Sequence, residues 1–304
     1  MKKTDFKPLE LSDRDSIVEI FSKYPPVISE YTFSNLFIWR KKNNTRTLIL
    51  NDGAFFIMSF NSYDFLLPPA GFKDYNEAWM EVIDLFLSDK SIKGIIKIPE
   101  KDIFLPCFKD FFIVKEDRDH FDYVYKTEDF ATLKGRRYDG KRWQIKKFIE
   151  SVPHETMLYD PELHMEDSIF LARKWETLKI SQHPENLEGY KAETEALIEY
   201  LHNFASLHCC GMIIISSGKV IAFSFGEKLN PETFVIHFEK ADPSYPGIYQ
   251  AMSHLFVKNL VSGRFNFINR EQDMGIEGLR NAKMSWHPYT FIKKFKILKD
   301  DFNP

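Results

Sequence analysis

The sequence contains little cysteine and no long hydrophobic run. Three cysteines occur among 304 residues, and neither Cys107 nor the adjacent pair Cys209 and Cys210 has the spacing of a metal site or of a disulfide framework. No window approaches the run of about 18 apolar residues that a membrane-spanning helix needs, and the N-terminus lacks the apolar core of a secretory signal. We therefore expect a cytoplasmic protein with buried cysteines, no membrane span and no bound metal.

An excess of positive charge is also missing. Forty-one basic and 44 acidic residues give a formal net charge of -3, so no global field attracts nucleic acid, although a local basic patch can still bind it. Aromatic residues are abundant, with 29 Phe, 13 Tyr and 5 Trp. A domain usually takes about 100 to 200 residues. The length and the aromatic bulk together predict a globular protein with two hydrophobic cores.

The second half of the chain alternates helical and strand patterns in a clear order. Asp160 and Pro161 form a good helix start, and apolar periodicity predicts the elements that follow. These are helices over 162–178 and 191–207, strands over 211–216, 220–227 and 233–239, a helix over 249–260, a strand over 265–269, a short helix over 276–282 and a strand over 290–297. The first half is more irregular, with a hairpin that turns at Gly53. The whole pattern indicates mixed sheets with helices.

The run from Val235 to Phe256 predicts a strand that passes through a tight turn into a helix. Such a turn presents free backbone N–H groups and the positive end of a helix, which together suit a phosphate or pyrophosphate. The predicted anion-binding turn consists of Tyr245, Pro246, Gly247, Ile248, Tyr249 and Gln250. A plain connection between strand and helix is the alternative. Tyr245 and Tyr249 either stack on an adenine or pack into the core.

Side-chain alternation along the strand over 233–239 places His237 and Glu239 on the same face, near the end of the strand. In direct attack of an amine on an acyl carbonyl, the site needs a route for the ammonium proton to leave. We predict that His237 and Glu239 form this acid–base pair. The alternative for His237 is a hydrogen-bonded histidine inside the sheet.

Polar residues follow the next apolar strand, where open α/β sheets place their ligands. Glu271 is a third catalytic candidate, and four more residues are predicted to bind the substrate: Asn269, Asp273, Arg280 and Lys283. The alternative for Asp273 is that it satisfies free N–H groups at a helix start. Arg280 and Lys283 either neutralise a substrate phosphate or carboxylate, or pair with Glu277 or Glu271 in a structural bridge.

A basic segment over 134–147 holds seven basic residues and one acid. It leads into a helix whose apolar face carries Ile145 and Phe148. Arg136, Arg137, Lys141 and Arg142 suit a polyphosphate or a tRNA backbone, whereas the alternative is a solvated helix face. We expect three parts in the chain: an N-terminal domain over 1–133, a basic connecting helix over 134–152, and a C-terminal domain over 153–304 with the active site.

Three runs carry a family resemblance. They are E-Y-T-F-S-N-L-F-I-W from Glu30, L-K-G-R-R-Y-D-G-K-R-W-Q-I-K-K-F from Leu133, and I-N-R-E-Q-D-M-G-I-E-G-L-R-N-A-K-M-S-W-H-P from Ile268. With the order of elements, they resemble a bacterial family of tandem GNAT-like proteins of unknown function, related to the C-terminal domain of phosphatidylglycerol lysyltransferase. The resemblance implies an α/β (α+β) fold of two GNAT-like acyltransferase domains in tandem, each with a mixed, mostly antiparallel twisted sheet flanked by helices.

The resemblance also implies a function, namely transfer of an acyl or aminoacyl group to a primary amine by direct attack. The donor is acyl-CoA or aminoacyl-tRNA, and the expected acceptor is a small-molecule amine or a peptide. The chain departs from the usual CoA-binding pattern, because it keeps only Gly247 and Ala251 of it. This departure supports an alternative function, a non-catalytic GNAT-like module that binds CoA or RNA.

Overall fold

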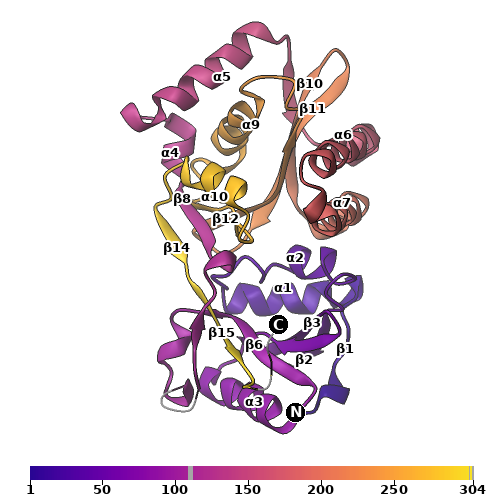
Figure 1. Cartoon of the computed structure of the whole chain (residues 1–304), viewed down its shortest axis with the longest axis vertical. Coiled ribbons are helices and arrows are strands. Elements are labelled where there is room, and N and C mark those ends of the chain that lie inside the picture. The colour runs from indigo at the N-terminus through magenta and orange to yellow at the C-terminus, as the bar shows by residue number, and fades with distance from the viewer. Residues whose placement is uncertain (109–111, 301, 303–304) are drawn as a thin grey trace. The chain divides into compact units, whose positions relative to one another are not determined.

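The chain folds into two compact units in the computed structural model, which describes residues 1–108, 112–300 and 302 (Figure 1). Unit 1 contains Met1–Val124 and continues from Glu271, whereas unit 2 contains Tyr125–Arg270. The extent of these units differs from the expected division at residues 133 and 153, because the last part of the chain groups with the first part. The basic segment lies within unit 2.

Unit 1 is built on a mixed sheet with the strand order β1-β2-β3-β4-β6-β15-β7, in which β5 also pairs with β3. The strands of this sheet are β1 (Lys7–Pro8), β2 (Arg46–Ile49), β3 (Gly53–Phe60), β4 (Tyr63–Leu66), β5 (Ala70–Gly71), β6 (Ile92–Pro99), β7 (Lys115–Glu116) and β15 (Lys294–Leu298). Strand β14 (Thr290–Ile292) also lies in unit 1 but pairs with β8 (Asp122–Lys126) and not with this sheet. The helices of unit 1 are α1 (Arg14–Lys23), α2 (Phe33–Ile38), α3 (Tyr75–Ser88) and α10 (Glu277–Met284). Strand β8 spans the boundary between the units.

Helix α3 shows why the core of unit 1 forms where it does. The side chain of Asp74 accepts a hydrogen bond from the N–H of Glu77 and so caps the helix start. Ala78, Trp79, Val82 and the other apolar residues at helical spacing are buried against the sheet. Full burial of a large apolar side chain contributes about 1.5 to 3 kcal/mol, so this helix face holds α3 on the strands.

The C-terminal strand β15 completes the sheet of unit 1. It pairs antiparallel with β6, with Phe295 opposite Ile98, and its other edge pairs with β7. Its first residue, Lys294, is completely buried. The Nζ of Lys294 donates to Oε2 of Glu30 at 2.5 Å and to Oδ1 of Asp122 at 2.7 Å. A buried ammonium therefore ties the end of the chain to segments near residues 30 and 122.

Further polar groups complete this buried ionic cluster. The amide of Gln272 donates to Ser29, Glu30 and Asp122 at 2.9 to 3.0 Å. Burial by itself raises the pKa of Glu30, but Lys294 and Lys97 outweigh it and hold that pKa at about 2. Because both carboxylates accept hydrogen bonds from the buried ammonium of Lys294, the cost of burying the charges is offset inside the cluster.

Unit 2 contains the sheet β13-β12-β11-β10-β9. Its strands are β9 (Glu155–Leu158), β10 (Cys210–Ser216), β11 (Lys219–Lys228), β12 (Thr233–Ala241) and β13 (Phe267–Asn269). Its helices are α4 (Thr127–Thr132), α5 (Asp139–Ser151), α6 (Pro161–Gln182), α7 (Leu187–His202), α8 (Phe204–Leu207) and α9 (Ile248–Phe256), and a π-helical turn over Val257–Val261 follows α9. The predicted order of elements in this part of the chain is confirmed.

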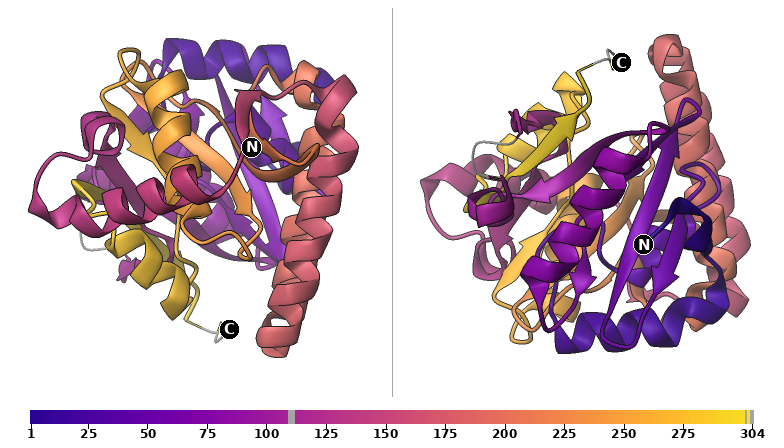
Figure 2. Two further views of the ribbon diagram at one scale, coloured as in Figure 1. Left: turned by 90° about the horizontal axis from the view of Figure 1, so that it is seen from above. Right: turned by 90° about the horizontal axis from the view of Figure 1, so that it is seen from below.

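Helices cover both faces of the unit 2 sheet. Figure 1 shows α6 and α7 on one face and α9 on the other, and the turned views of Figure 2 show the same separation. Helix α5 packs on the outside of α9. The expected fold of each unit, a mixed sheet flanked by helices, is confirmed.

The buried ionic cluster predicts a large loss of stability on substitution of Lys294. Lys294→Met removes the ammonium that both buried carboxylates share and leaves Glu30 with the more distant Lys97 alone, so we expect the free energy of unfolding to fall by about 3 to 5 kcal/mol. The adjacent Lys293 is the matched control, because its ion pair with Glu100 is half-exposed, with side-chain exposures of 44% and 47%. Lys293→Met should change stability by less than about 1 kcal/mol. Denaturant unfolding of both variants measures the difference, and equal losses would contradict the role of the cluster.

Candidate active site

Strand β12 extends well beyond its neighbour β13. The two strands run parallel, and their ladder holds only three residue pairs, from Thr233 opposite Phe267 to Val235 opposite Asn269. Strand β12 continues to Ala241, so among the described residues its edge has no strand partner on that side over 236–241. An unpaired edge offers backbone N–H and C=O groups to a ligand.

A β-bulge in β12 separates the two residues of the predicted acid–base pair. Ile236 lies opposite Gly226 and Phe238 lies opposite Phe225, so His237 is an extra residue in the ladder. The ring of His237 lies 6.2 Å from that of Tyr200 on α7, whereas Glu239 contacts α9. The expectation that His237 and Glu239 share a face is wrong, because the bulge reverses the alternation between them.

The side chain of His237 is buried and contacts another side chain of the same sheet. Its side chain is 1% exposed, and its Nε2 lies 2.9 Å from Oε1 of Glu227. Gly226 makes the bulge possible, because a Cβ at this position would lie 2.2 Å from the carbonyl oxygen of Val235. The alternative of a hydrogen-bonded histidine within the sheet describes these contacts.

Glu239 lies in a small polar cluster on the α9 face. Its Oε1 accepts hydrogen bonds from the Ser253 hydroxyl at 2.7 Å and from Nη2 of Arg270 at 2.9 Å. Its Oε2 is buried and has no hydrogen-bond partner among the described residues. A buried oxygen of this kind is costly unless a further donor reaches it. Glu239 can therefore accept a hydrogen bond or a proton from a ligand amine.

Lys141 brings a titrating amine near this cluster. It lies in the first turn of α5 and is half-buried. Burial lowers the pKa of Lys141 to about 8, and the nearby guanidinium of Arg270 acts in the same direction. An amine with this pKa exists in both protonation states near neutral pH, so it can bind an anion or move a proton.

The other basic residues of the segment over 134–147 differ in whether other groups of the chain bind their guanidinium groups. Arg142 donates to the carbonyl groups of Leu133 and Gly135 and pairs with Asp139. Arg137 pairs with Asp129 at 3.1 Å, and Arg136 is exposed. Intrachain contacts thus hold the guanidinium groups of Arg142 and Arg137. Their predicted role as phosphate ligands stays a prediction.

The turn between β12 and α9 is more closed than the sequence suggested. The N–H groups of Tyr245 and Ile248 donate to the carbonyls of Asp242 and Tyr245, both at 3.2 Å. A Cβ at Gly247 would lie 2.2 Å from the carbonyl oxygen of Gln144 in α5. The space expected to admit a phosphate at Gly247 is therefore occupied by α5. Two amides at the start of α9, those of Tyr249 and Gln250, have no acceptor among the described residues.

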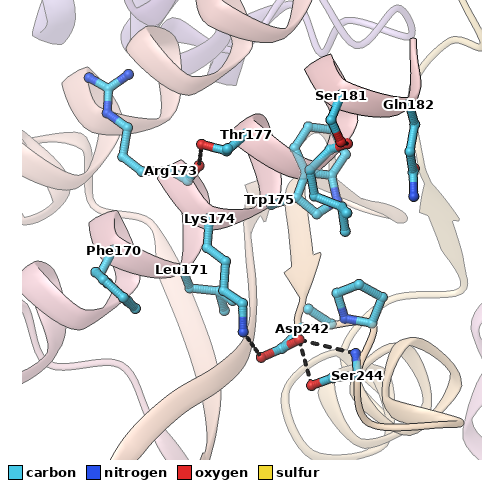
Figure 3. Close-up of a pocket in the computed structure, with 13 residues that line it drawn as sticks. Phe170, Leu171, Arg173, Lys174, Trp175, Thr177, Ser181, Gln182, Asp242 and Ser244 are labelled. Atoms are coloured by element: carbon cyan, nitrogen blue, oxygen red, sulfur yellow. Dashed lines mark hydrogen bonds and ion pairs between the residues drawn. The ribbon is translucent and has the colours of Figure 1, made fainter.

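A cavity of about 880 Å³ lies between α6 and the end of β12 (Figure 3). Its lining includes Trp175 and Lys174 of α6 and Asp242 of the turn. The ammonium of Lys174 donates to the carboxylate of Asp242 at 2.5 Å. The same carboxylate also accepts hydrogen bonds from the backbone N–H and the hydroxyl of Ser244. The floor is largely apolar, so the cavity suits the body of a small organic ligand.

Trp175 links this cavity to the start of α9. Its Nε1 donates to the hydroxyl of Tyr249 at 2.9 Å, and the ammonium of Lys240 lies 3.1 Å from the centroid of its ring. Burial raises the pKa of Tyr249 to about 12. Tyr249 thus packs in the protein, which is one of the two alternatives that the sequence left open. Tyr245 is half-buried beside the turn.

The polar run after β13 divides between the two units. Asn269, at the end of β13, is buried. In unit 1, the carboxylate of Glu271 accepts from the Asn35 amide at 2.9 Å, and the Nζ of Lys283 lies 3.5 Å from the Glu271 carbonyl oxygen. The predicted catalytic role of Glu271 and substrate-binding roles of Asn269 and Lys283 stay predictions.

Asp273 and Arg280 are engaged with each other. The buried Asp273 carboxylate accepts two hydrogen bonds from the guanidinium of Arg280 at 2.9 Å, and a third from the N–H of Gly275. Although burial raises the pKa of Asp273, the bonds from Arg280, the Tyr123 hydroxyl and Gly275 hold it well below its usual range. The bond to Gly275 fits the alternative in which Asp273 satisfies a free N–H. Arg280 pairs with Asp273 and Asp119, not with Glu277.

Several residues of the site were missed by sequence reasoning. Arg270 and Ser253 act on Glu239 across the fold, and no spacing in the sequence connects them to it. Trp175 and Lys174 lie in the helix predicted over 162–178, and nothing in the sequence marked them as residues of a site. The cysteines were expected to be buried, but Cys107, Cys209 and Cys210 are only partly buried.

Comparison with known proteins identifies the family. Residues 21–298 match the family model described as phosphatidylglycerol lysyltransferase, C-terminal, so the chain belongs to this family. The resemblance seen in the three sequence runs is confirmed. Comparison with the curated proteins finds no match. Among the described residues, no helix combines the length and the apolar character needed to cross a membrane.

Solved structures place the fold. A conserved protein of unknown function from Bacteroides thetaiotaomicron is 32% identical over 97% of this chain and 99% of that one, with a TM-score of 0.86. The C-terminal domain of a putative lysylphosphatidylglycerol synthetase from Agrobacterium fabrum gives 10% identity and a TM-score of 0.67, covering 95% of this chain and 92% of that one. A tandem GNAT protein from the clavulanic acid biosynthesis pathway gives 7% identity and a TM-score of 0.51, covering 98% of this chain and 99% of that one. The chain thus has the tandem GNAT-like fold.

The close approach of α5 to the turn predicts a specific sensitivity at Gly247. Gly247→Ala should destabilise the protein by several kcal/mol more than Gly218→Ala, because a methyl group at 247 collides with the α5 backbone. Gly218 is the matched control: its φ is also positive, +74° against +86°, but no atom lies within 4 Å of the position that a Cβ would take there. The backbone conformation alone costs about 1 kcal/mol. Thermal or denaturant unfolding compares the two, and equal effects would contradict the contact.

Arg270 should control the titration of Lys141. Removing the guanidinium in Arg270→Gln removes a positive neighbour, so the pKa of Lys141 should rise above about 8. Arg142→Gln is the control, because Arg142 lies next to Lys141 on α5. This variant should leave the pKa of Lys141 unchanged. NMR titration of isotope-labelled lysine side chains, with the signal assigned by Lys141→Arg, measures the shift. A pKa that stays the same in Arg270→Gln would exclude the proposed coupling.

Proposed function

We propose that the chain transfers an acyl or aminoacyl group to a primary amine, with the reaction at the open edge of β12 in unit 2. The donor is acyl-CoA or aminoacyl-tRNA, and the acceptor is a small amine or a peptide amine. The observation that carries this proposal is the carboxylate of Glu239, which is buried on the strand with the open edge and has one oxygen without a partner among the described residues.

The donor is held by its phosphates and by its acyl arm. The amides of Tyr249 and Gln250 at the start of α9, together with the ammonium of Lys141, suit a phosphate group. Arg136 and its basic neighbours suit the further phosphates of a nucleotide or an RNA end. The unpaired edge of β12 can hydrogen-bond the acyl arm and the oxyanion that forms during attack.

The chemical step requires a neutral amine. Oε2 of Glu239 accepts a proton from the acceptor ammonium, and the free amine nitrogen then forms a bond to the donor carbonyl carbon. The carbon–sulfur bond of a thioester, or the carbon–oxygen bond of an aminoacyl ester, breaks in turn. The amine nitrogen gives its second proton to the leaving thiolate or alkoxide, and Glu239 releases the first proton to solvent, so the products are an amide, free CoA or tRNA, and one proton. Arg270 keeps Glu239 positioned for this transfer.

A second candidate function is a non-catalytic module that binds CoA or RNA. The closed turn supports it, because the amides of Tyr245 and Ile248 are used within the chain and α5 occupies the space at Gly247. A module of this kind needs the anion-binding groups but not the unpartnered oxygen of Glu239.

Glu239→Gln separates these two functions. Loss of the proton acceptor should lower the rate of transfer at least about 100-fold, while donor binding changes by less than about twofold because the shape is kept. Glu193→Gln is the control, since Glu193 pairs with Lys240 near α6 and α7. The full chain is assayed with panels of acyl-CoA, aminoacyl-tRNA and amines, and products are identified by mass spectrometry. A wild-type protein that binds a donor but forms no product favours the binding module, and full activity of Glu239→Gln would exclude Glu239 as the proton acceptor.

A further inference from the structure

Unit 1 contains a cavity of its own, with a volume of about 330 Å³. It lies between the end of α1, the loop after β4 and the end of β6. Strands β4 and β6 run parallel, as β12 and β13 do in unit 2. In each unit the cavity therefore lies beside a helix, at the carboxyl end of the first strand of a parallel pair. This is the position where α/β sheets bind their ligands.

Prolines and aromatic side chains make up much of the wall of the unit 1 cavity, with polar surface between them. Five prolines line it, namely Pro25, Pro26, Pro68, Pro69 and Pro99, and proline has no N–H to donate. The hydroxyl of Tyr31 donates to the carbonyl of Pro68, and the hydroxyl of Tyr75 donates to Asp102 at 2.7 Å. The polar atoms of both tyrosines are thus engaged, and their rings remain as contact surface. Such walls suit a planar, apolar group.

The charge at the cavity is positive. Lys23 and Lys101 line it, and no carboxylate does so among the described residues. Lys23 is bonded to Glu19 at 2.7 Å, whereas the Nζ of Lys101 lies 5.8 Å from the centroid of the Tyr75 ring. Asp102 is 2% exposed, and its pKa is raised by burial and lowered by the hydrogen bond from Tyr75 and by the nearby ammonium of Lys101. An anionic group on a ligand can therefore be neutralised by Lys101.

The loop between β5 and α3, beside the unit 1 cavity, does not offer the backbone amides of Phe72 and Lys73 to a polyphosphate. The N–H of Phe72 donates to the carbonyl of Asp52 at 2.7 Å, and that of Lys73 lies 3.4 Å from the Asp52 carboxylate. The carboxylate of Asp74 occupies the start of α3. An anion at this cavity meets the ammonium of Lys101, since the ammonium of Lys23 is bonded to Glu19, and this arrangement suits one carboxylate better than a chain of phosphates.

The shape of the cavity is fixed in advance. Phe72 has a φ of +70°, a conformation that a bulky residue adopts only under constraint. Its ring packs 4.6 Å from that of Phe55, and a Cβ at Gly53 would lie 2.4 Å from it. The packing of this ring holds the loop, and the proline walls add stiffness, so a ligand meets a preorganised surface.

We propose that the unit 1 cavity binds a small aromatic carboxylate, with the ring between the proline and tyrosine walls and the carboxylate on the ammonium of Lys101. This site is separate from the transfer reaction proposed for unit 2 and does not depend on it. The ligand is defined by its chemistry: one flat apolar ring of a size that the cavity admits, and one negative charge.

Binding of three matched probes to the full chain tests this site. Benzoate should bind saturably and more tightly than neutral benzamide or cationic benzylamine, as measured by ligand-detected NMR and calorimetry. Lys101→Met should weaken benzoate binding about tenfold, the loss of one charge-assisted hydrogen bond, and leave benzamide unchanged. Lys90→Met is the matched control, because Lys90 is an exposed lysine of unit 1 that does not line the cavity.

A second variant addresses the ring site itself. Val27→Trp places a large side chain at the half-buried position 27 in the wall and should abolish binding of benzoate and benzamide alike. Thermal unfolding of each variant verifies that it is folded. The proposal is overturned if no probe binds saturably, if benzoate and benzamide bind equally, or if Lys90→Met weakens benzoate as much as Lys101→Met does.

Discussion

The completely buried ammonium of Lys294 is the polar group on which the assembly of unit 1 depends. It contacts Glu30 and Asp122, which lie far from it in the sequence, and the amide of Gln272 contacts the same two carboxylates. Each of these charges would be costly if it were buried alone. The N-terminal segment, the end of the first half and the C-terminal strand must therefore be in place together, and this requirement makes the last part of the chain a component of unit 1.

In unit 2 the corresponding constraints are a bulge and a close helix contact. The extra residue at His237 directs that imidazole towards α7 and leaves Glu239 facing α9 with Ser253 and Arg270. Gly247 lets α5 approach the turn, which brings Lys141 into the same region. The candidate site is thus assembled from a strand with an open edge, the carboxylate of Glu239 and the basic groups of Arg270 and Lys141. The two cavities lie at corresponding places in the two units but differ in chemistry.

Much of this arrangement was predictable from the sequence, and the failures have identifiable causes. The strand–turn–helix over 235–256 and the order of elements around it followed from periodicity, because local patterns set these elements. The shared face of His237 and Glu239 did not follow, since a bulge depends on the register with β11. Gly247 lies against the carbonyl oxygen of Gln144 in α5, a contact that no local pattern indicated, and its predicted role in phosphate binding stays a prediction.

The sequence by itself determined the family, the element order and the chemical inventory of the chain, because runs such as that from Ile268 and the apolar periodicities are local properties. Only the tertiary structure decided which of these groups meet. The guanidinium of Arg270 donates a hydrogen bond to Glu239, that of Arg280 donates to Asp273, and β15 pairs with β6. These contacts join residues that are distant in the chain, and their energies depend on burial and on register, which no local pattern encodes.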